Sequence, residues 1–157
     1  MDNEKFILVI ADDSKEMNVA LRYACARSKK TNRKIMIVTF IEPLDVLTTQ
    51  GVTEIMQNEA REDAEKRLRY ASSVVKESTG ELPVLHVKEG EIIQELKKLI
   101  NEEKNINVLV LGANVDEKEK DPGPIISSLV SKELSDIRVP IMIVPGNFSS
   151  EHIALIT

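Results

Sequence analysis

The sequence predicts a single-domain α/β protein: a three-layer α/β/α sandwich around a mostly parallel sheet of five strands. Five short apolar runs alternate with segments whose apolar residues recur every three or four positions, which gives the order βαβαβαβαβ. Each run is apolar at consecutive positions, and this is typical of strands buried on both faces of a parallel sheet. The 157 residues, 42% of them hydrophobic, fit one core, and no linker or internal repeat divides them.

The individual elements follow from the apolar pattern in chain order. The predicted strands cover residues 6–11, 35–41, 83–87, 108–111 and 141–144. The predicted helices follow the apolar positions in 17–25, 52–75, 92–100 and 126–137. Ser14 is expected to cap the first helix, and a loop is expected from Glu42 to Gly51 because Pro43 interrupts the second strand. We assign residues 1–146 to the domain and 147–157 to a C-terminal tail, with one helical turn after Ser149-Ser150.

Charge and composition exclude several classes of partner. The formal net charge is −5 and the chain carries no basic stripe, so nucleic acid and anionic membrane surfaces lack their main electrostatic attraction. No apolar run approaches the ~20 residues of a membrane-spanning helix, and the first apolar run is too short for a secretory signal, so we expect a cytoplasmic protein. Cys25 is the only cysteine, which excludes an intrachain disulfide and a cysteine metal cluster.

Two families with related strand patterns fit the residues poorly. A phosphoacceptor receiver domain would hold Mg²⁺ with paired acids such as Asp12-Asp13, but it also needs an aspartate at the end of the third strand, where this chain has Lys88-Glu89-Gly90. This hypothesis is disfavoured, and labelling with acetyl phosphate would test it. A dinucleotide-binding domain needs Gly-x-Gly-x-x-Gly directly after the first strand, and residues 12–17 contain no glycine.

Short motifs at the ends of the strands follow one another in a defined order along nearly the whole chain. They are Asp12-Asp13-Ser14, Ala20-Leu21 with Ala24, Phe40-Ile41-Glu42-Pro43, Val87-Lys88-Glu89-Gly90, Val108 to Gly112, and Val139-Pro140 before the last strand. In this order and spacing they resemble the universal stress protein family, of the UspA type. Gly123-Pro124 and Pro145-Gly146-Asn147 are similar to a branch of that family found among α-proteobacteria. The resemblance implies a Rossmann-like fold of the adenine nucleotide α-hydrolase-like kind and a role in stress response.

The resemblance also implies a nucleotide pocket beyond the carboxyl ends of the strands. Its candidate residues are Ala11, Asp12, Asp13, Phe40, Ile41, Gly112, Ala113, Val115, Ser127 and Ser128. ATP-binding members carry Gly-x2-Gly-x9-Gly-(Ser/Thr) from the fourth strand into the last helix, and these glycines let backbone N–H groups approach the phosphates. Gly112 matches the first glycine, Val115 and Ser127 replace the other two, and Ser128 stands at the hydroxyl position. The segment 116–126 is also longer than the motif allows.

These changes predict weak or absent ATP binding. Valine is β-branched, so a left-handed turn at Val115 would be strained by ~1–2 kcal/mol. The acidic run from Asp116 to Asp121 holds four acids and two bases, which repel a triphosphate unless a divalent cation is bound. Asp13 replaces the small glycine of the family pattern, and Phe40 stands where a smaller residue often lines the adenine pocket.

Other features keep a nucleotide site open as the alternative. Ser127 and Ser128 are expected at a helix N-terminus, where their hydroxyls could donate to a ligand. Asp121-Pro122-Gly123-Pro124 is a constrained turn that could form a different anion-binding nest. The first hypothesis is therefore a non-enzymatic stress-response protein with a degenerate site and no cofactor. The second is a sensor that holds ATP or another adenine nucleotide.

The sequence supplies no catalytic or metal-binding set, and it predicts one contact with a second copy. His86 and His152 have no cysteine or carboxylate partner at ligand spacing, and Ser14 lacks a Gly-x-Ser-x-Gly context, so we expect neither metal nor enzyme activity. An open edge strand that is uncharged and β-prone would pair with another chain. The last strand has this character, and family members commonly dimerise there, so a homodimer is predicted through Ile141, Met142, Ile143 and Val144.

Overall fold

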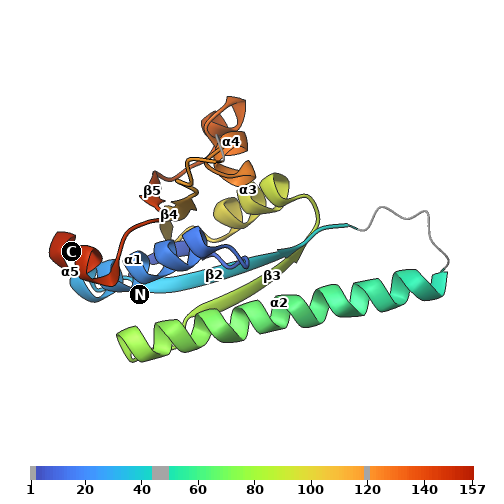
Figure 1. The fold of residues 1–157 in the computed structure, drawn as a ribbon, viewed down its shortest axis with the longest axis horizontal. Helices are drawn as coiled ribbons and strands as arrows, with labels where there is room; N and C mark the ends of the chain where they lie inside the picture. The colour runs from blue at the N-terminus through green and yellow to red at the C-terminus, as the bar shows by residue number, and fades with distance from the viewer. Residues whose placement is uncertain (1–2, 44–49, 119–120) are drawn as a thin grey trace.

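The computed structural model describes residues 3–43, 50–118 and 121–157 and contains one five-stranded sheet in the order β3-β2-β1-β4-β5 (Figure 1). The strands are β1 (Phe6–Ile10), β2 (Lys34–Ile41), β3 (Val84–Glu89), β4 (Ile106–Ala113) and β5 (Ile141–Pro145). Every neighbouring pair of strands is parallel. The parallel α/β fold that the sequence predicts is therefore confirmed.

Helices cover both faces of the sheet and complete the three layers. They are α1 (Lys15–Thr31), α2 (Gln50–Thr79), α3 (Ile92–Glu102), α4 (Pro124–Leu129), the 3-10 helix η1 (Lys132–Asp136) and α5 (Ser150–Ile156). One face packs against α1 and α2, with α5 beside α1, and the other face packs against α3 and α4. None of the helices in the described part of the chain is long and apolar enough to cross a membrane.

The central strand β1 explains why the strands are continuous apolar runs. Leu8 pairs in register with Met36 of β2 and with Leu109 of β4, and none of these side chains is more than 2% exposed. Leu8 belongs to the core beneath α3 and α4, whereas its neighbour Ile7 belongs to the core beneath α1 and α2, because successive side chains of a strand point to opposite faces. Strand order reverses between β1 and β4, and ligands of such sheets bind at this point.

The segment after β4 differs from the single helix that the apolar pattern predicts over 126–137. The structure has two separate short helices, α4 and η1, instead. Ser131 lies between them with φ −93° and ψ −138°, and its Oγ donates to the carbonyl oxygen of Ser128 at 2.7 Å. Val130 and Leu134, which the pattern placed on a buried face, are 50% and 47% exposed. The prediction was wrong because a serine hydroxyl competes for the carbonyl that helix continuation would use.

The C-terminal tail contains the helical turn that the sequence predicts. Ser149 caps α5, and its Oγ accepts a hydrogen bond from the backbone N–H of His152 at 3.0 Å. Ile153 is buried against α1, so this segment belongs to the packed structure. Of the loop predicted from Glu42 to Gly51, residues 44–49 lie outside the described residues, and α2 already begins at Gln50.

Candidate functional site

The carboxyl end of β1 carries two of the predicted site acids, and they have different environments. Asp12 Oδ1 accepts hydrogen bonds from the backbone N–H and the Oγ of Ser14, at 2.8 and 2.5 Å. Ser14 Oγ in turn accepts from Met17 N at 3.2 Å, which confirms the predicted cap of α1. Asp12 therefore serves the first turn of α1, where a carboxylate is favoured by the helix dipole. The side chain of Asp13 is 84% exposed.

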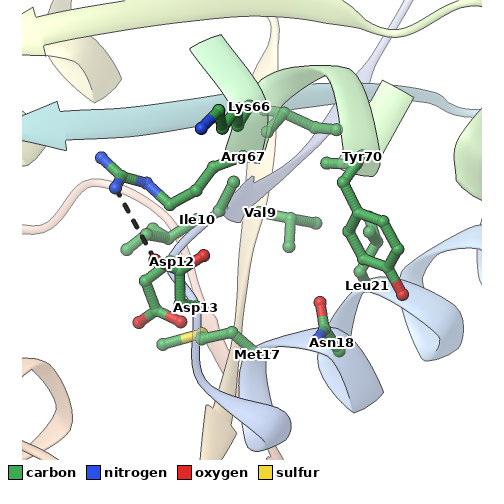
Figure 2. A pocket seen from close by; sticks show the side chains of 13 residues that line it. Val9, Ile10, Asp12, Asp13, Met17, Asn18, Leu21, Lys66, Arg67 and Tyr70 are labelled. Carbon is green, nitrogen blue, oxygen red and sulfur yellow. Dashed lines mark ion pairs between the residues drawn. The ribbon is translucent and has the colours of Figure 1, made fainter. Parts of the chain in front are cut away.

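Arg67 of α2 reaches the carboxyl ends of β1 and β2, and the sequence analysis missed it. Its Nε donates to Thr39 Oγ1 at 2.9 Å and its Nη2 donates to the carbonyl oxygen of Phe40 at 3.2 Å. Thr39 Oγ1 donates onward to the carbonyl oxygen of Ala11 at 2.8 Å. The Arg67 side chain is only 16% exposed, and its Nη1 lies 3.9 Å from a carboxylate oxygen of Asp13 (Figure 2). One guanidinium thus ties the ends of two strands together.

A signal for Arg67 was present in the helical pattern. Arg67 stands three positions after Ala64 and four before Ala71, and both alanines are buried against the sheet. Residues at these spacings share one face of a helix, so the arginine had to point toward the sheet. Only the register of α2 against β2 could show which strand it would reach.

Phe40 and Ile41, the residues predicted to line the adenine pocket, are buried, and their backbone carbonyls are hydrogen-bonded within the chain. Phe40 and Ile41 are each 8% exposed. The carbonyl oxygen of Phe40 accepts from Arg67, and that of Ile41 accepts from Gly90 N at 3.0 Å. Both backbone carbonyls therefore already have donors within the chain.

The predicted site residues do not line one common cavity. Ala11, Asp12 and Asp13 line a cavity of about 150 Å³ with α1 and α2 residues, among them Arg67 and Tyr70 (Figure 2). Ile41 and Val115 line two other hollows, each with different neighbours. Pockets for drug-sized ligands measure roughly 300–1,000 Å³. The cavity at the end of β1 is smaller than this, whereas the hollow lined by Val115 measures about 420 Å³.

Gly112 matches the first glycine of the phosphate motif, but it also has a packing role. A Cβ atom at this position would lie 1.9 Å from the carbonyl oxygen of Glu16 in the first turn of α1. The backbone N–H of Gly112 donates to Met17 Sδ at 3.4 Å. The neighbouring Ala113 is buried, and its carbonyl oxygen accepts from Gly146 N at 2.8 Å. The close approach of α1 to β4 therefore requires glycine at 112.

The loop after β4 does not make the left-handed turn that the motif requires. Among the non-glycine residues that the structure describes, only Asn32 has a positive φ, so the strain expected at Val115 is not present. The Val115 side chain is 45% exposed, and the loop is held by local bonds such as Asp116 N to Asn114 Oδ1 at 2.9 Å. Glu119 and Lys120 of the predicted acidic run lie outside the described residues.

The carboxylate of Asp121 accepts the hydrogen bonds that are available around the turn before α4. Asp121 Oδ1 accepts from Gly123 N at 2.9 Å and from Ser127 Oγ at 2.6 Å. The Ser127 hydrogen bond, followed by the Gly123 one, lowers the pKa of Asp121 below its usual value. Gly123 is the N-cap of α4, with φ 126°, and the helix runs from Pro124 to Leu129. Ser127 and Ser128 therefore lie in its second half. Their predicted position at the helix N-terminus was wrong, because the helix begins at Pro124.

Other reactive side chains do not assemble into a second site. Within residues 3–43, 50–118 and 121–157, no group of three or more His, Cys, Asp or Glu side chains could hold a metal ion. Burial raises the pKa of the Cys25 thiol to about 11, which keeps it protonated and unreactive at neutral pH. His86 Nε2 lies 3.9 Å from Glu103 Oε1, which is too far for a hydrogen bond.

Several solved structures share this fold at low sequence identity. The universal stress protein UspA from Lactobacillus plantarum superimposes with a TM-score of 0.70 at 13% identity, covering 92% of this chain and 99% of that one. A universal stress protein in complex with cAMP gives 0.64 at 18% identity, with 91% and 98% covered. A family protein from Arabidopsis thaliana with AMP bound gives 0.61 at 11% identity, with 90% and 91% covered.

The sequence itself places the chain in a family. No curated protein matches it. The universal stress protein family, however, matches residues 5–145, a range that runs from β1 to the end of β5 and includes every predicted site residue. The chain therefore belongs to the universal stress protein family.

Proposed function

We propose that this chain is a non-enzymatic stress-response protein with a degenerate nucleotide site, acting as a homodimer in the cytoplasm. The observation that carries the proposal is the position of the Asp121 carboxylate. It accepts from Gly123 N in the turn before α4 and from Ser127 Oγ in the helix, two donors that could otherwise bind a phosphate. A phosphate bound there would have to displace a carboxylate whose lowered pKa keeps it charged.

The other end of the predicted pocket supports the same conclusion. An adenine ring can be held by backbone groups at the end of a strand, yet the Phe40 carbonyl already accepts from Arg67. Displacing a partly buried guanidinium that makes two hydrogen bonds costs more than displacing water. The chain thus satisfies internally the groups that would recognise both ends of a nucleotide.

Calorimetric titration with ATP and Mg²⁺ tests the degenerate site. We expect no binding in the micromolar range for the natural sequence. Asp121→Asn should raise affinity for ATP or pyrophosphate several-fold, because it removes the charge that competes for the two donors. Asp116→Asn removes the same charge from the same loop without freeing Gly123 N, so it should have a smaller effect. Micromolar binding of ATP by the natural sequence would overturn the proposal.

The proposed homodimer rests on the edge position of β5. The strand pairs with β4 on one side, and its other side is an edge of the sheet. Ile143 is 45% exposed at the centre of the strand. Sedimentation analysis should show a dimer at micromolar concentration, and Ile143→Lys should weaken it because a charge would enter the edge contact. A monomer of the natural sequence at this concentration would contradict a dimer through β5.

The alternative function is adenine-nucleotide sensing through the altered loop. It is favoured by the two neighbouring structures determined with cAMP and with AMP. A monophosphate needs fewer donors than a triphosphate, so the turn before α4 could reject ATP and still admit AMP. Titration with AMP and cAMP beside ATP separates the two functions. Micromolar binding of AMP or cAMP would favour the sensor.

A further inference from the structure

The outward face of α2 carries a pattern of side chains that is complementary to itself. The α2 stripe consists of Val52, Ile55, Glu59, Glu62, Lys66, Arg69, Ser73 and Lys76, which are all exposed. We propose that this stripe is a contact surface for a second copy of the chain, with the two α2 helices packed antiparallel. The proposal concerns a different surface from β5 and does not depend on the nucleotide site.

The spacing of the stripe keeps it on one side of the helix. Its members recur at alternating intervals of three and four residues, which is the spacing of a helix-pairing seam. At about 100° per residue, all eight positions fall within roughly 60° of the direction opposite Ala64. Ala64 is 1% exposed and faces the sheet, so the stripe lies on the opposite side of α2 over a length of about 36 Å. Lys66 and the C-terminal members Arg69, Ser73 and Lys76 also border hollows of their own domain.

A twofold axis at the level of Ala64 pairs the stripe with itself. In such a contact, residues equally far from the axis on opposite sides meet one another, and each pair occurs twice. The facing pairs are Val52 with Lys76, Ile55 with Ser73, Glu59 with Arg69, and Glu62 with Lys66. Every acid of the stripe therefore meets a base of the other copy, and Val52 meets the aliphatic stem of a lysine.

Parallel packing of the same two helices is disfavoured by the same charges. In register, Glu59 and Glu62 would meet their own copies, and so would Lys66 and Arg69. Like charges that face one another across a seam are destabilising. The stripe thus specifies the antiparallel orientation as well as the partner.

The charges are not explained by the dipole of α2 alone. Acids near a helix N-terminus and bases near its C-terminus are favoured, but only within the first and last turns. Positions 59 to 69 lie in the middle of a helix of 30 residues. Within the helix, Arg69 contacts Glu65 at 3.8 Å, and both side chains are 67% exposed. An exposed ion pair at this distance contributes little to stability, so Arg69 can exchange Glu65 for an acid on a second copy.

Apolar side chains at the N-terminal end of α2 are left exposed by the part of the domain that the structure describes. Val52, Ile55 and Met56 are 45%, 60% and 41% exposed. This end of α2 runs past the end of the sheet (Figure 1). In the antiparallel pair, the Val52 and Ile55 side chains of one copy lie against the C-terminal half of α2 in the other, which itself packs on a sheet. The α2 stripe also leaves β5 free, because β5 forms the edge opposite β3 and α2 packs against β2.

Charge exchange in the stripe tests the proposal. The background carries Ile143→Lys, so that association through β5 does not hide the result. Glu59→Arg with Glu62→Lys should raise the dimer dissociation constant in sedimentation analysis by roughly tenfold or more, because attraction becomes repulsion. Lys66→Glu with Arg69→Glu should do the same. Combining all four changes restores complementarity, and association should return to near the starting value.

A matched control separates the stripe from the overall charge of the protein. Glu54→Arg with Asp63→Lys changes the net charge by the same amount on the same helix, but both positions lie to the sides of the stripe. It should leave the dissociation constant within about twofold. Absence of rescue in the fourfold exchange, or an equal loss in the control, would overturn the antiparallel contact.

Crosslinking measures the same contact in the natural sequence background. Glu59→Cys and Arg69→Cys are prepared as separate proteins and treated with a short bifunctional maleimide. The mixture should give a crosslinked dimer far more efficiently than either protein alone, because position 59 faces position 69. Cys25 should not react, since it is 1% exposed and its pKa is raised to about 11. Equal crosslinking of Glu59→Cys with itself would indicate a different orientation and contradict the proposal.

Discussion

The carboxyl ends of the parallel strands lie at the same edge of the sheet. The polar groups at the ends of β1 and β2 and those in the segment after β4 find their hydrogen-bond partners in different parts of the chain. At the ends of β1 and β2, Arg67 of the distant helix α2 donates to Thr39 and Phe40 of β2, and Thr39 donates onward to the carbonyl oxygen of Ala11 after β1. In the segment between β4 and α4, by contrast, Gly123 N and Ser127 Oγ donate to the nearby Asp121. In the proposed degenerate site, a tertiary contact thus occupies the groups at one end, and a short-range turn occupies those at the other.

The largest effect is expected from Gly112, where α1 lies directly on β4. In Gly112→Ala the new Cβ would overlap the carbonyl oxygen of Glu16, and α1 would have to move. We expect a loss of about 3 kcal/mol or more in the free energy of unfolding, measured with urea.

Gly51→Ala is the matched control for this change. It adds the same methyl group in α2, where nothing lies within 4 Å of the new atom. It should change the free energy of unfolding by no more than about 0.5 kcal/mol, because position 51 lies in the first turn of α2 and the new methyl group meets nothing. A loss below about 1 kcal/mol in Gly112→Ala would mean that α1 does not depend on this close approach.

A smaller effect is expected at the carboxyl ends of β1 and β2, which Arg67 links. Arg67→Ala removes the hydrogen bonds to Thr39 and Phe40 and should lower the free energy of unfolding by about 1–3 kcal/mol. Arg67→Lys should recover only part of this loss, because an ammonium group cannot reproduce the planar fork. Arg61→Ala, on the exposed side of the same helix, should stay within about 0.5 kcal/mol. Equal effects at the two arginines would show that Arg67 does not link the strands.

The smallest effect is expected in the turn before α4 and depends on pH. Because the pKa of Asp121 is lowered in the folded protein, its contribution to stability is present above the unfolded pKa, near ~3.9, and is lost as pH falls through the folded pKa. Asp121→Asn should therefore abolish part of the acid sensitivity of unfolding below about pH 4. Thermal unfolding of both proteins across this range measures the difference. The same acid sensitivity in the variant would contradict a stabilising role for the charged Asp121.

Much of the segment from the end of β4 to α4 could be predicted from residues close together in the sequence. The loss of two motif glycines and the turn at Asp121 to Pro124 are visible in the sequence, because they involve residues a few positions apart. The interpretation still failed for Ser127 and Ser128, since the helix begins at Pro124 and breaks at Ser131. Single hydrogen bonds of serine and aspartate decide such boundaries, and an apolar pattern does not record them.

By itself, the sequence determined the order of strands and helices, the parallel sheet and the family, because apolar periodicity and strand-end motifs are properties of neighbouring residues. Only the tertiary structure decided that Arg67 reaches Phe40 and that Gly112 lies against Glu16. These contacts join segments far apart in the chain. Their geometry depends on the register at which each helix packs against the sheet. Packing between distant segments therefore decided which polar groups at the strand ends have partners within the chain.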